Sequence, residues 1–185
     1  MKAAAVALLL LVIAPGAIAQ ASNEKPSGAA NPIVTTVRQM EARYAKNLVG
    51  AADEMPADKY SYRPTPEQMT FAHLIMHIAE SNNTLCAAIA GEQPRSTKMS
   101  ETDSKDMLAR VLKDSFAYCE QVLNKADDST LNEPATLFGG HTGTRGAALV
   151  HLAADWADHY SAAATYLRLN NLLPPSARKA AGKSD

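Results

Sequence analysis

Apolar side chains recur at steps of three and four residues in four segments of this 185-residue chain. Such a repeat places the apolar residues on one face of an α-helix. Alternation of apolar and polar residues, which is the pattern of a half-buried strand, never extends beyond a few positions. The chain is therefore expected to be all-α, with four helices.

The first helix is expected from Asn31, a suitable N-cap, through Pro32, a suitable first helical residue, to about Ala52. Its apolar positions are Ile33, Val37, Met40, Tyr44 and Leu48. Three prolines exclude a continuous helix over residues 53–66 and mark a long loop: Pro56, Pro64 and Pro66. The second helix is expected from about Thr70 to Ala90, with Phe71, Leu74, Ile78, Leu85 and Ile89 on its apolar positions.

Gly91 and Pro94 end the second helix, and Ser100 with Asp103 resembles a capping box before the third. The buried stripe of that helix is predicted to be Met107, Val111, Leu112, Phe116, Cys119, Val122 and Leu123. Residues 126–142 show little periodicity, and a fourth helix is expected from about Thr144 to Asn170. The connections between the expected helices are roughly ten to seventeen residues long, which permits crossovers as well as simple up-down hairpins. The predicted fold is a four-helix bundle with long crossover-type loops.

The first nineteen residues have the pattern of a secretory signal peptide. Lys2 precedes an apolar stretch that is too short to span a bilayer, and Ala17-Ile-Ala19 fits a cleavage site. We therefore expect residues 1–19 to be removed and the protein to be exported, either periplasmic or secreted. No stable membrane span is expected in the mature form.

The mature chain is long enough for one domain with a full core. We expect a flexible leader at residues 20–30, the bundle at 31–175 and a flexible tail at 176–185. Removing residues 1–19 takes away one lysine and no acid, which changes the formal net charge from −1 to about −2. That balance, without a concentrated basic face, argues against binding to nucleic acid.

Cys86 and Cys119 are the only cysteines, and each falls in a predicted helix. In an oxidising compartment they could join the two helices by a disulfide. Two buried free thiols are the alternative. A zinc site that uses both thiols is disfavoured, since neither has a ligand-spaced neighbour.

Five histidines raise the possibility of a metal site. Asp155 and His159 lie one helical turn apart on one face, and so do His151 and Asp155. His151 and His159 are separated by about 12 Å along the axis and cannot share an ion. The second helix offers His73, His77 or both. Two imidazoles and one carboxylate from two helices would suit Zn, Ni or Fe(II) in a site with open positions.

Residues 155–175, which read Asp-Trp-Ala-Asp-His-Tyr and continue to Thr-Tyr-Leu-Arg and Pro-Pro, resemble the last helix of the DinB-like superfamily. Residues 70–80 are similar to the family's second helix, which carries a single ligand histidine. The resemblance implies metal ligands at His77, Asp155 and His159. Asp155 stands where the family usually has His, and Asp is a harder, charged ligand.

The resemblance leaves three histidines outside the triad. His73 is kept as an alternative ligand, His151 is expected in the core or beside the ligands, and His141 in a solvated loop. Asp158 and Glu80 lie near the ligands in sequence, and Asp158 points about 100° away from its neighbour His159. Neither acid is assigned as a catalytic base. Trp156 and Tyr160 are expected to be packing residues.

Two functions are compatible with such a metal site. The first is a metal-dependent hydrolase that acts on a small molecule of unknown identity. Thiol transfer, the other activity implied by the resemblance, uses intracellular thiols and fits an exported protein less well. The second is a non-catalytic metal- or ligand-binding bundle of the cell envelope, and a purely structural interaction domain is the alternative to both. The resemblance also implies a possible homodimer.

Overall fold

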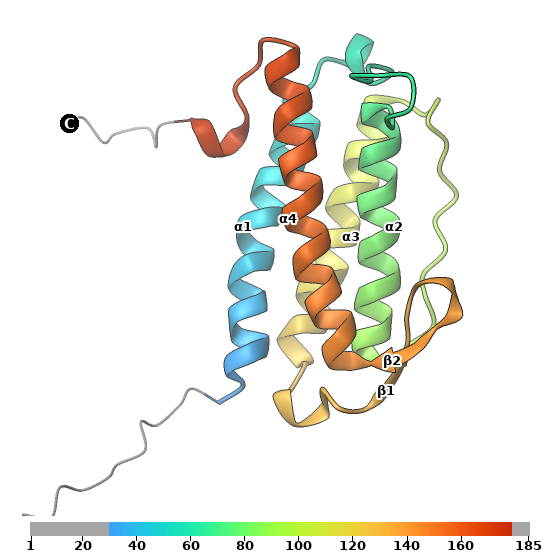
Figure 1. The fold of residues 1–185 in the computed structure, drawn as a ribbon, viewed down its shortest axis with the longest axis vertical. Coiled ribbons are helices and arrows are strands. Elements are labelled where there is room, and N and C mark those ends of the chain that lie inside the picture. Colours follow the sequence, from blue (N-terminus) through green and yellow to red (C-terminus); the bar gives the residue numbers. More distant parts are fainter. Residues whose placement is uncertain (1–29, 179–185) are drawn as a thin grey trace, which may run out of the picture.

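The computed structural model describes residues 30–178 and confirms the all-α four-helix bundle (Figure 1). The signal peptide predicted at residues 1–19, nearly all of the leader and the end of the tail lie outside the described residues. The four long helices are α1 (Pro32–Glu54), α2 (Phe71–Ala90), α3 (Lys105–Lys125) and α4 (Arg145–Leu169). Four short 3-10 segments lie in the connections: Ala57–Lys59, Asp128–Thr130, Phe138–Gly140 and Pro175–Ala177. No helix among the described residues is long and apolar enough to cross a membrane.

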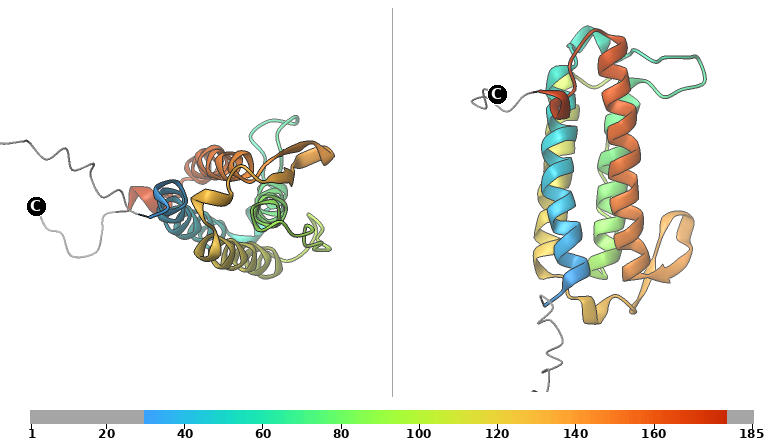
Figure 2. Two further views of the ribbon diagram at one scale, coloured as in Figure 1. Left: turned by 90° about the horizontal axis from the view of Figure 1, so that it is seen from below. Right: turned by 60° about the vertical axis from the view of Figure 1, so that its left-hand side comes forward.

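The helices form a square in which α1 and α2 occupy opposite corners (Figure 2). Helices α3 and α4 occupy the other two corners, and each packs against both α1 and α2. Since α2 and α3 run in the same direction, residues 91–104 return along the length of α2 (Figure 1). Thr97 and Glu101 of this segment hydrogen-bond to Asn83 and Thr70 of the α2 region, at 3.1 and 2.7 Å. The predicted crossover is thus confirmed.

The start of α3 differs from the prediction. The N-cap is Ser104, whose hydroxyl accepts a hydrogen bond from the backbone N–H of Met107 at 3.3 Å. The Ser100 N–H does donate to the Asp103 carboxylate at 2.8 Å, as in a capping box. However, this pair closes a turn that precedes the helix. The helix begins after Ser104, whose hydroxyl is also a good N-cap acceptor.

The first turn of α1 is held by a residue far away in sequence. Asn31 occupies the predicted N-cap position, but its φ of 59° is left-handed and its side chain does not cap the helix. Instead, the two carboxylate oxygens of Asp128 accept the N–H groups of Ile33 and Val34, both at 2.9 Å. In return, the Asn31 side chain accepts the Asp128 N–H at 3.0 Å. The loop after α3 therefore fastens the start of α1.

A short hairpin between α3 and α4 was not predicted. Strand β1 (Pro134–Thr136) pairs antiparallel with β2 (Thr142–Thr144), and Ala135 lies opposite Gly143. Three residues per strand are too few to produce a detectable alternation. Gly139 and Gly140 adopt φ values of 66° and 78° in the connecting loop, where a residue with a Cβ would be strained.

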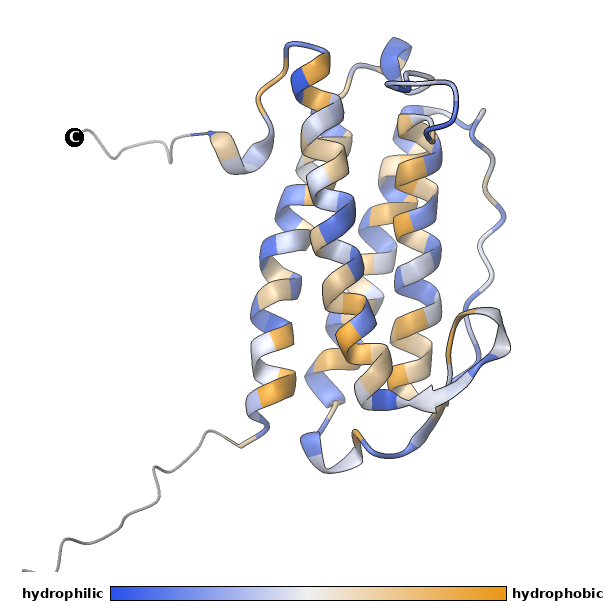
Figure 3. Cartoon of the chain, in the orientation of Figure 1, coloured by the Kyte–Doolittle hydropathy of each residue, from blue (hydrophilic) through white to orange (hydrophobic). Residues whose placement is uncertain are grey.

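The core lies between the four helices, along which apolar and polar residues are interspersed (Figure 3). The predicted apolar positions of α2 are all buried. Ile33 and Met107, expected in the buried stripes, are exposed, because both lie in the first turns of their helices at the ends of the bundle. Cys86 and Cys119 form a disulfide between α2 and α3, so of the two expected alternatives, a disulfide and two buried free thiols, the structure has the disulfide.

Asp128→Ala is expected to lower the free energy of unfolding by about 2 kcal/mol, because two N–H groups of α1 lose a charged acceptor. Urea denaturation of the purified protein measures this change. Asp114→Ala, which removes an exposed carboxylate in the middle of α3, is the control and should change stability by less than about 0.5 kcal/mol. Equal effects of the two substitutions would contradict the capping role of Asp128.

Glu41 introduces a pH dependence into the bundle. Burial on α1, together with the nearby Glu120 carboxylate, raises its pKa from 4.5 to about 7. Between these values the folded protein binds more protons than the unfolded chain, so the free energy of unfolding falls as pH rises through this interval. Glu41→Gln should therefore stabilise the protein at pH 8, by about 1 kcal/mol after allowance for screening, and have little effect at pH 5. Thermal unfolding at both pH values checks this, with the exposed Glu67→Gln as control; an equal gain at pH 5 and pH 8 would contradict it.

Candidate metal centre

The structure brings together the three predicted ligands from two helices. His77 lies on α2, while Asp155 and His159 lie one turn apart on α4. One potential ligand atom from each residue lies within 4.8 Å of those of the other two. The imidazole rings of His77 and His159 are stacked, with centroids 4.7 Å apart and an interplanar angle of 22°. The arrangement is compact enough for all three to reach one ion.

A buried hydrogen bond fixes how the two ligand-bearing helices lie against each other. The indole N–H of Trp156 on α4 donates to the side-chain oxygen of Asn82 on α2 at 2.7 Å. The Asn82 amide in turn donates to the Ser115 hydroxyl on α3 at 3.0 Å. Both Trp156 and Asn82 are fully buried. Because Trp156 adjoins Asp155 and Asn82 follows His77 by little more than one turn, this bond sets the relative position of the proposed ligands.

Trp156 is the packing residue that was expected. Its ring contacts those of Phe116 and Tyr44, with centroids 5.8 and 6.5 Å away. Tyr160 also packs against Tyr44, at 6.3 Å, and donates its hydroxyl hydrogen to Ser176.

The orientation of His159 is set by its own helix. Its Nδ1 lies 2.8 Å from the backbone carbonyl oxygen of Asp155. A carbonyl can only accept a hydrogen bond, so Nδ1 carries the proton and donates it. The unprotonated Nε2 is then the atom available to a metal, as in many sites where a backbone carbonyl holds the ligand histidine.

Asp155 supplies the carboxylate of the three proposed ligands. Its Oδ2 is buried and has no hydrogen-bond partner among the described residues. Burial raises the pKa of this carboxyl, whereas the neighbouring His159 and His77 act in the opposite direction. A buried carboxylate oxygen without a partner is costly. A hydrogen-bond donor would satisfy Oδ2 and leave Oδ1 free to bind, so the donor set of two imidazoles and one carboxylate fits a bound divalent metal.

His77 is suited to act as a neutral ligand. Burial lowers its pKa, and the nearby His159 lowers it further. Both effects disfavour the imidazolium form, which could not bind a metal. The site thus favours the protonation state that metal binding requires.

The remaining histidines are not part of this cluster. His73, the alternative ligand, has its Nδ1 2.7 Å from the Glu101 carboxylate at the edge of the site. His151 is exposed on α4 rather than placed in the core or beside the ligands, so that expectation was wrong. His141 is exposed in the hairpin loop, as expected. Among the described residues, the only cluster of three potential ligands is the one that contains His77.

Sequence reasoning missed Ser81 at this site. It lies one turn after His77 on α2, is almost fully buried, and has a hydroxyl without a hydrogen-bond partner among the described residues. The four-residue spacing from a ligand histidine was visible in the sequence. A serine at that spacing carries no distinctive signal, however, without knowledge of which face of α2 meets α4.

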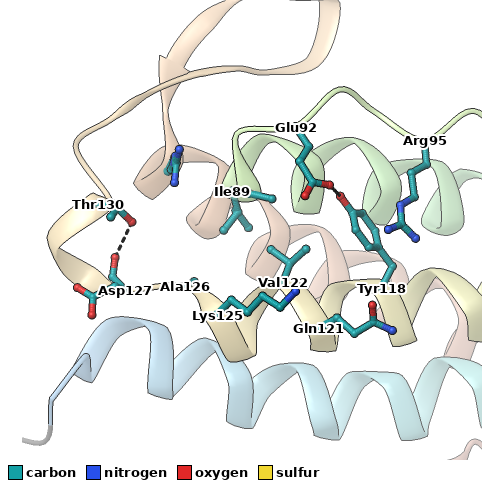
Figure 4. A pocket seen from close by; sticks show the side chains of 12 residues that line it. Ile89, Glu92, Arg95, Tyr118, Gln121, Val122, Lys125, Ala126, Asp127 and Thr130 are labelled. Atoms are coloured by element: carbon teal, nitrogen blue, oxygen red, sulfur yellow. Dashed lines mark hydrogen bonds between the residues drawn. The ribbon is translucent and has the colours of Figure 1, made fainter.

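A separate cavity of about 230 Å³ lies at the other end of α2 and α3 (Figure 4). Ile89 in its wall follows His77 by about 18 Å along the helix axis. Three of the polar side chains in its wall contact one another. The Tyr118 hydroxyl donates to Glu92 at 3.1 Å, and the Arg95 guanidinium lies over the Tyr118 ring. This cavity has no part in the metal centre.

Comparison with known proteins identifies relatives of the fold. A family model described as the DinB superfamily matches residues 39–163. A DinB-like protein from Bacillus subtilis is 18% identical, with a TM-score of 0.63 over 78% of this chain and 99% of that chain. A DinB-like protein from Bacillus cereus is 14% identical, with a TM-score of 0.62 over 76% and 95%.

A third similar structure is a mycothiol-dependent maleylpyruvate isomerase, which is 15% identical, with a TM-score of 0.57 over 69% of this chain and 59% of that chain. No curated protein sequence matches the chain significantly. At these identities the structural similarity shows a shared fold, and the function has to be argued from the site itself.

Proposed function

The chain belongs to the DinB superfamily, whose family model spans more than half of its length, and we propose that it is an exported metal-dependent hydrolase. The observation that carries the proposal is the convergence of His77, Asp155 and His159, whose potential ligand atoms lie within 4.8 Å of one another. We assign these three residues as ligands of Zn, Ni or Fe(II). The substrate would be a small molecule.

Bound at this site, a divalent ion would act as a Lewis acid and would lower the pKa of a coordinated water. Two imidazoles and one carboxylate leave positions open for water and substrate, which is typical of reactive rather than structural sites. The protein's own contribution is to hold the ligands in place, through the carbonyl that orients His159 and the Trp156–Asn82 bond.

His73 is the group we propose for proton transfer. It lies one turn before His77 on α2, and its Nδ1 pairs with Glu101. Thr70 also donates a hydrogen bond to Glu101, at 2.7 Å. A carboxylate on Nδ1 orients the ring and leaves Nε2 to accept or donate a proton, which is the arrangement that general acid–base catalysis requires. About half of the His73 side chain is exposed, so a substrate at the edge of the site could reach it.

Export is proposed on two grounds. The N-terminal sequence has the pattern of a signal peptide. In addition, the Cys86–Cys119 disulfide is of the kind that persists in an oxidising compartment. The homodimer implied by the resemblance stays a prediction.

The first prediction from this proposal concerns metal content. Protein purified without chelators, or loaded with Zn or Ni and dialysed, should contain about one ion per chain. His159→Ala should lose the ion, whereas His151→Ala, which removes an exposed histidine from the same helix, should retain it. Elemental analysis measures both. Wild-type protein that holds no ion even after loading would overturn the metal assignment.

The second prediction concerns catalysis. In a panel of ester, amide and phosphoester substrates, hydrolysis by the wild type should stop on addition of a chelator and in His159→Ala. His73→Ala should keep the metal but lose about 100-fold in kcat, the size of effect typical of a lost acid–base group. Activity that survives His159→Ala would count against this site. A metal-loaded protein that is inactive on the whole panel would favour the non-catalytic binding bundle.

A further inference from the structure

Two buried polar atoms without partners lie in the same region of the molecule. One is the hydroxyl oxygen of Ser81 on α2, and the other is Oδ2 of Asp155 on α4. The Ser81 residue is only 1% exposed, so water cannot easily satisfy its hydroxyl. Native proteins rarely leave such groups unpaired, and each one requires an explanation.

The two groups are chemically complementary. A serine hydroxyl has a hydrogen to donate, and an ionised carboxylate only accepts. Ser81 follows His77 by one turn on the same face of α2, and potential ligand atoms of His77 and Asp155 lie within 4.8 Å of each other, so this face of α2 meets Asp155. The Ser81 hydroxyl also lowers the pKa of the Asp155 carboxyl, after the effects of burial and of the two ligand histidines.

We propose that Ser81 is a positioning residue, whose hydroxyl donates a hydrogen bond to Oδ2 of Asp155 and turns Oδ1 toward His77 and His159. Oδ1 lies 3.8 Å from Nδ1 of His159, so the carboxylate already lies beside the ring whose Nε2 is available to a metal. In this arrangement Asp155 binds a metal through one oxygen, and its second oxygen is satisfied by the protein. The inference rests on the metal centre proposed above.

The placement of Ser81 explains how an aspartate can serve at this position. An imidazole has one available ligand atom once its other nitrogen is held, whereas a free carboxylate can bind through either oxygen or both. A hydrogen bond to one oxygen removes that freedom. Groups that hold ligands in this way commonly change metal affinity by about 10- to 100-fold.

Metal affinity of three variants tests the proposal. Ser81→Ala removes the hydroxyl, Ser81→Thr keeps it, and Thr84→Val removes a hydroxyl from the next turn of α2 as the matched control. Competition with a chromophoric chelator should show Zn and Ni bound about 10- to 100-fold more weakly by Ser81→Ala. Ser81→Thr and Thr84→Val should stay close to the wild type. The absorption spectrum of Co(II)-loaded Ser81→Ala should also change, because the carboxylate is free to bind through both oxygens.

A thermal-unfolding cycle on metal-free protein separates failure of this inference from failure of the metal centre. Ser81→Ala should lower Tm in the wild type, and this effect should disappear in the Asp155→Ala background, where no acceptor remains. If the wild type binds metal but Ser81→Ala changes neither the metal affinity nor the Tm of the metal-free protein, the role of Ser81 is refuted and the metal centre stands. If the wild type binds no metal, the metal centre fails, and the role of Ser81 fails with it whatever the cycle shows.

Discussion

The hydrogen bond from Trp156 to Asn82 determines how α4 lies against α2, and the proposed site depends on that relation. Buried polar groups are costly unless they are paired, so this bond permits only a narrow range of axial shifts between the helices. A slide by one residue would break it and would also separate His77 from Asp155. The hydrogen bond from Asn82 to Ser115 extends the same constraint to α3.

The rest of the bundle keeps this arrangement in place. The Cys86–Cys119 disulfide joins α2 to α3 close to Asn82, and the Cys119 sulfur lies 3.5 Å from the backbone carbonyl oxygen of Asn82. Asp128, which follows α3, fastens the start of α1 by accepting two of its backbone N–H groups. The crossover between α2 and α3 has a chemical consequence as well, because it carries Glu101 to His73 at the edge of the metal centre.

Periodicity and proline positions were sufficient to predict the four helices and their approximate ends, because these are local properties of the chain. The length of the connections indicated crossover-type loops. The residue pattern left several ligand combinations open, and the family resemblance selected His77 with Asp155 and His159, the set that the structure brings together. The contacts that were missed depend on partners far apart in sequence. Asp128 as the cap of α1 is one example, and the pairing of His73 with Glu101 is another.

The most direct test of the account is an anomalous-difference map from crystals grown with Zn or Ni, recorded at the absorption edge of the metal. The account predicts one strong peak about 2.0–2.2 Å from a ring nitrogen of His77, Nε2 of His159 and one oxygen of Asp155. Density at the other histidines, such as His73 with Glu101, together with none at the triad, would contradict it. So would crystals in which the triad holds no metal.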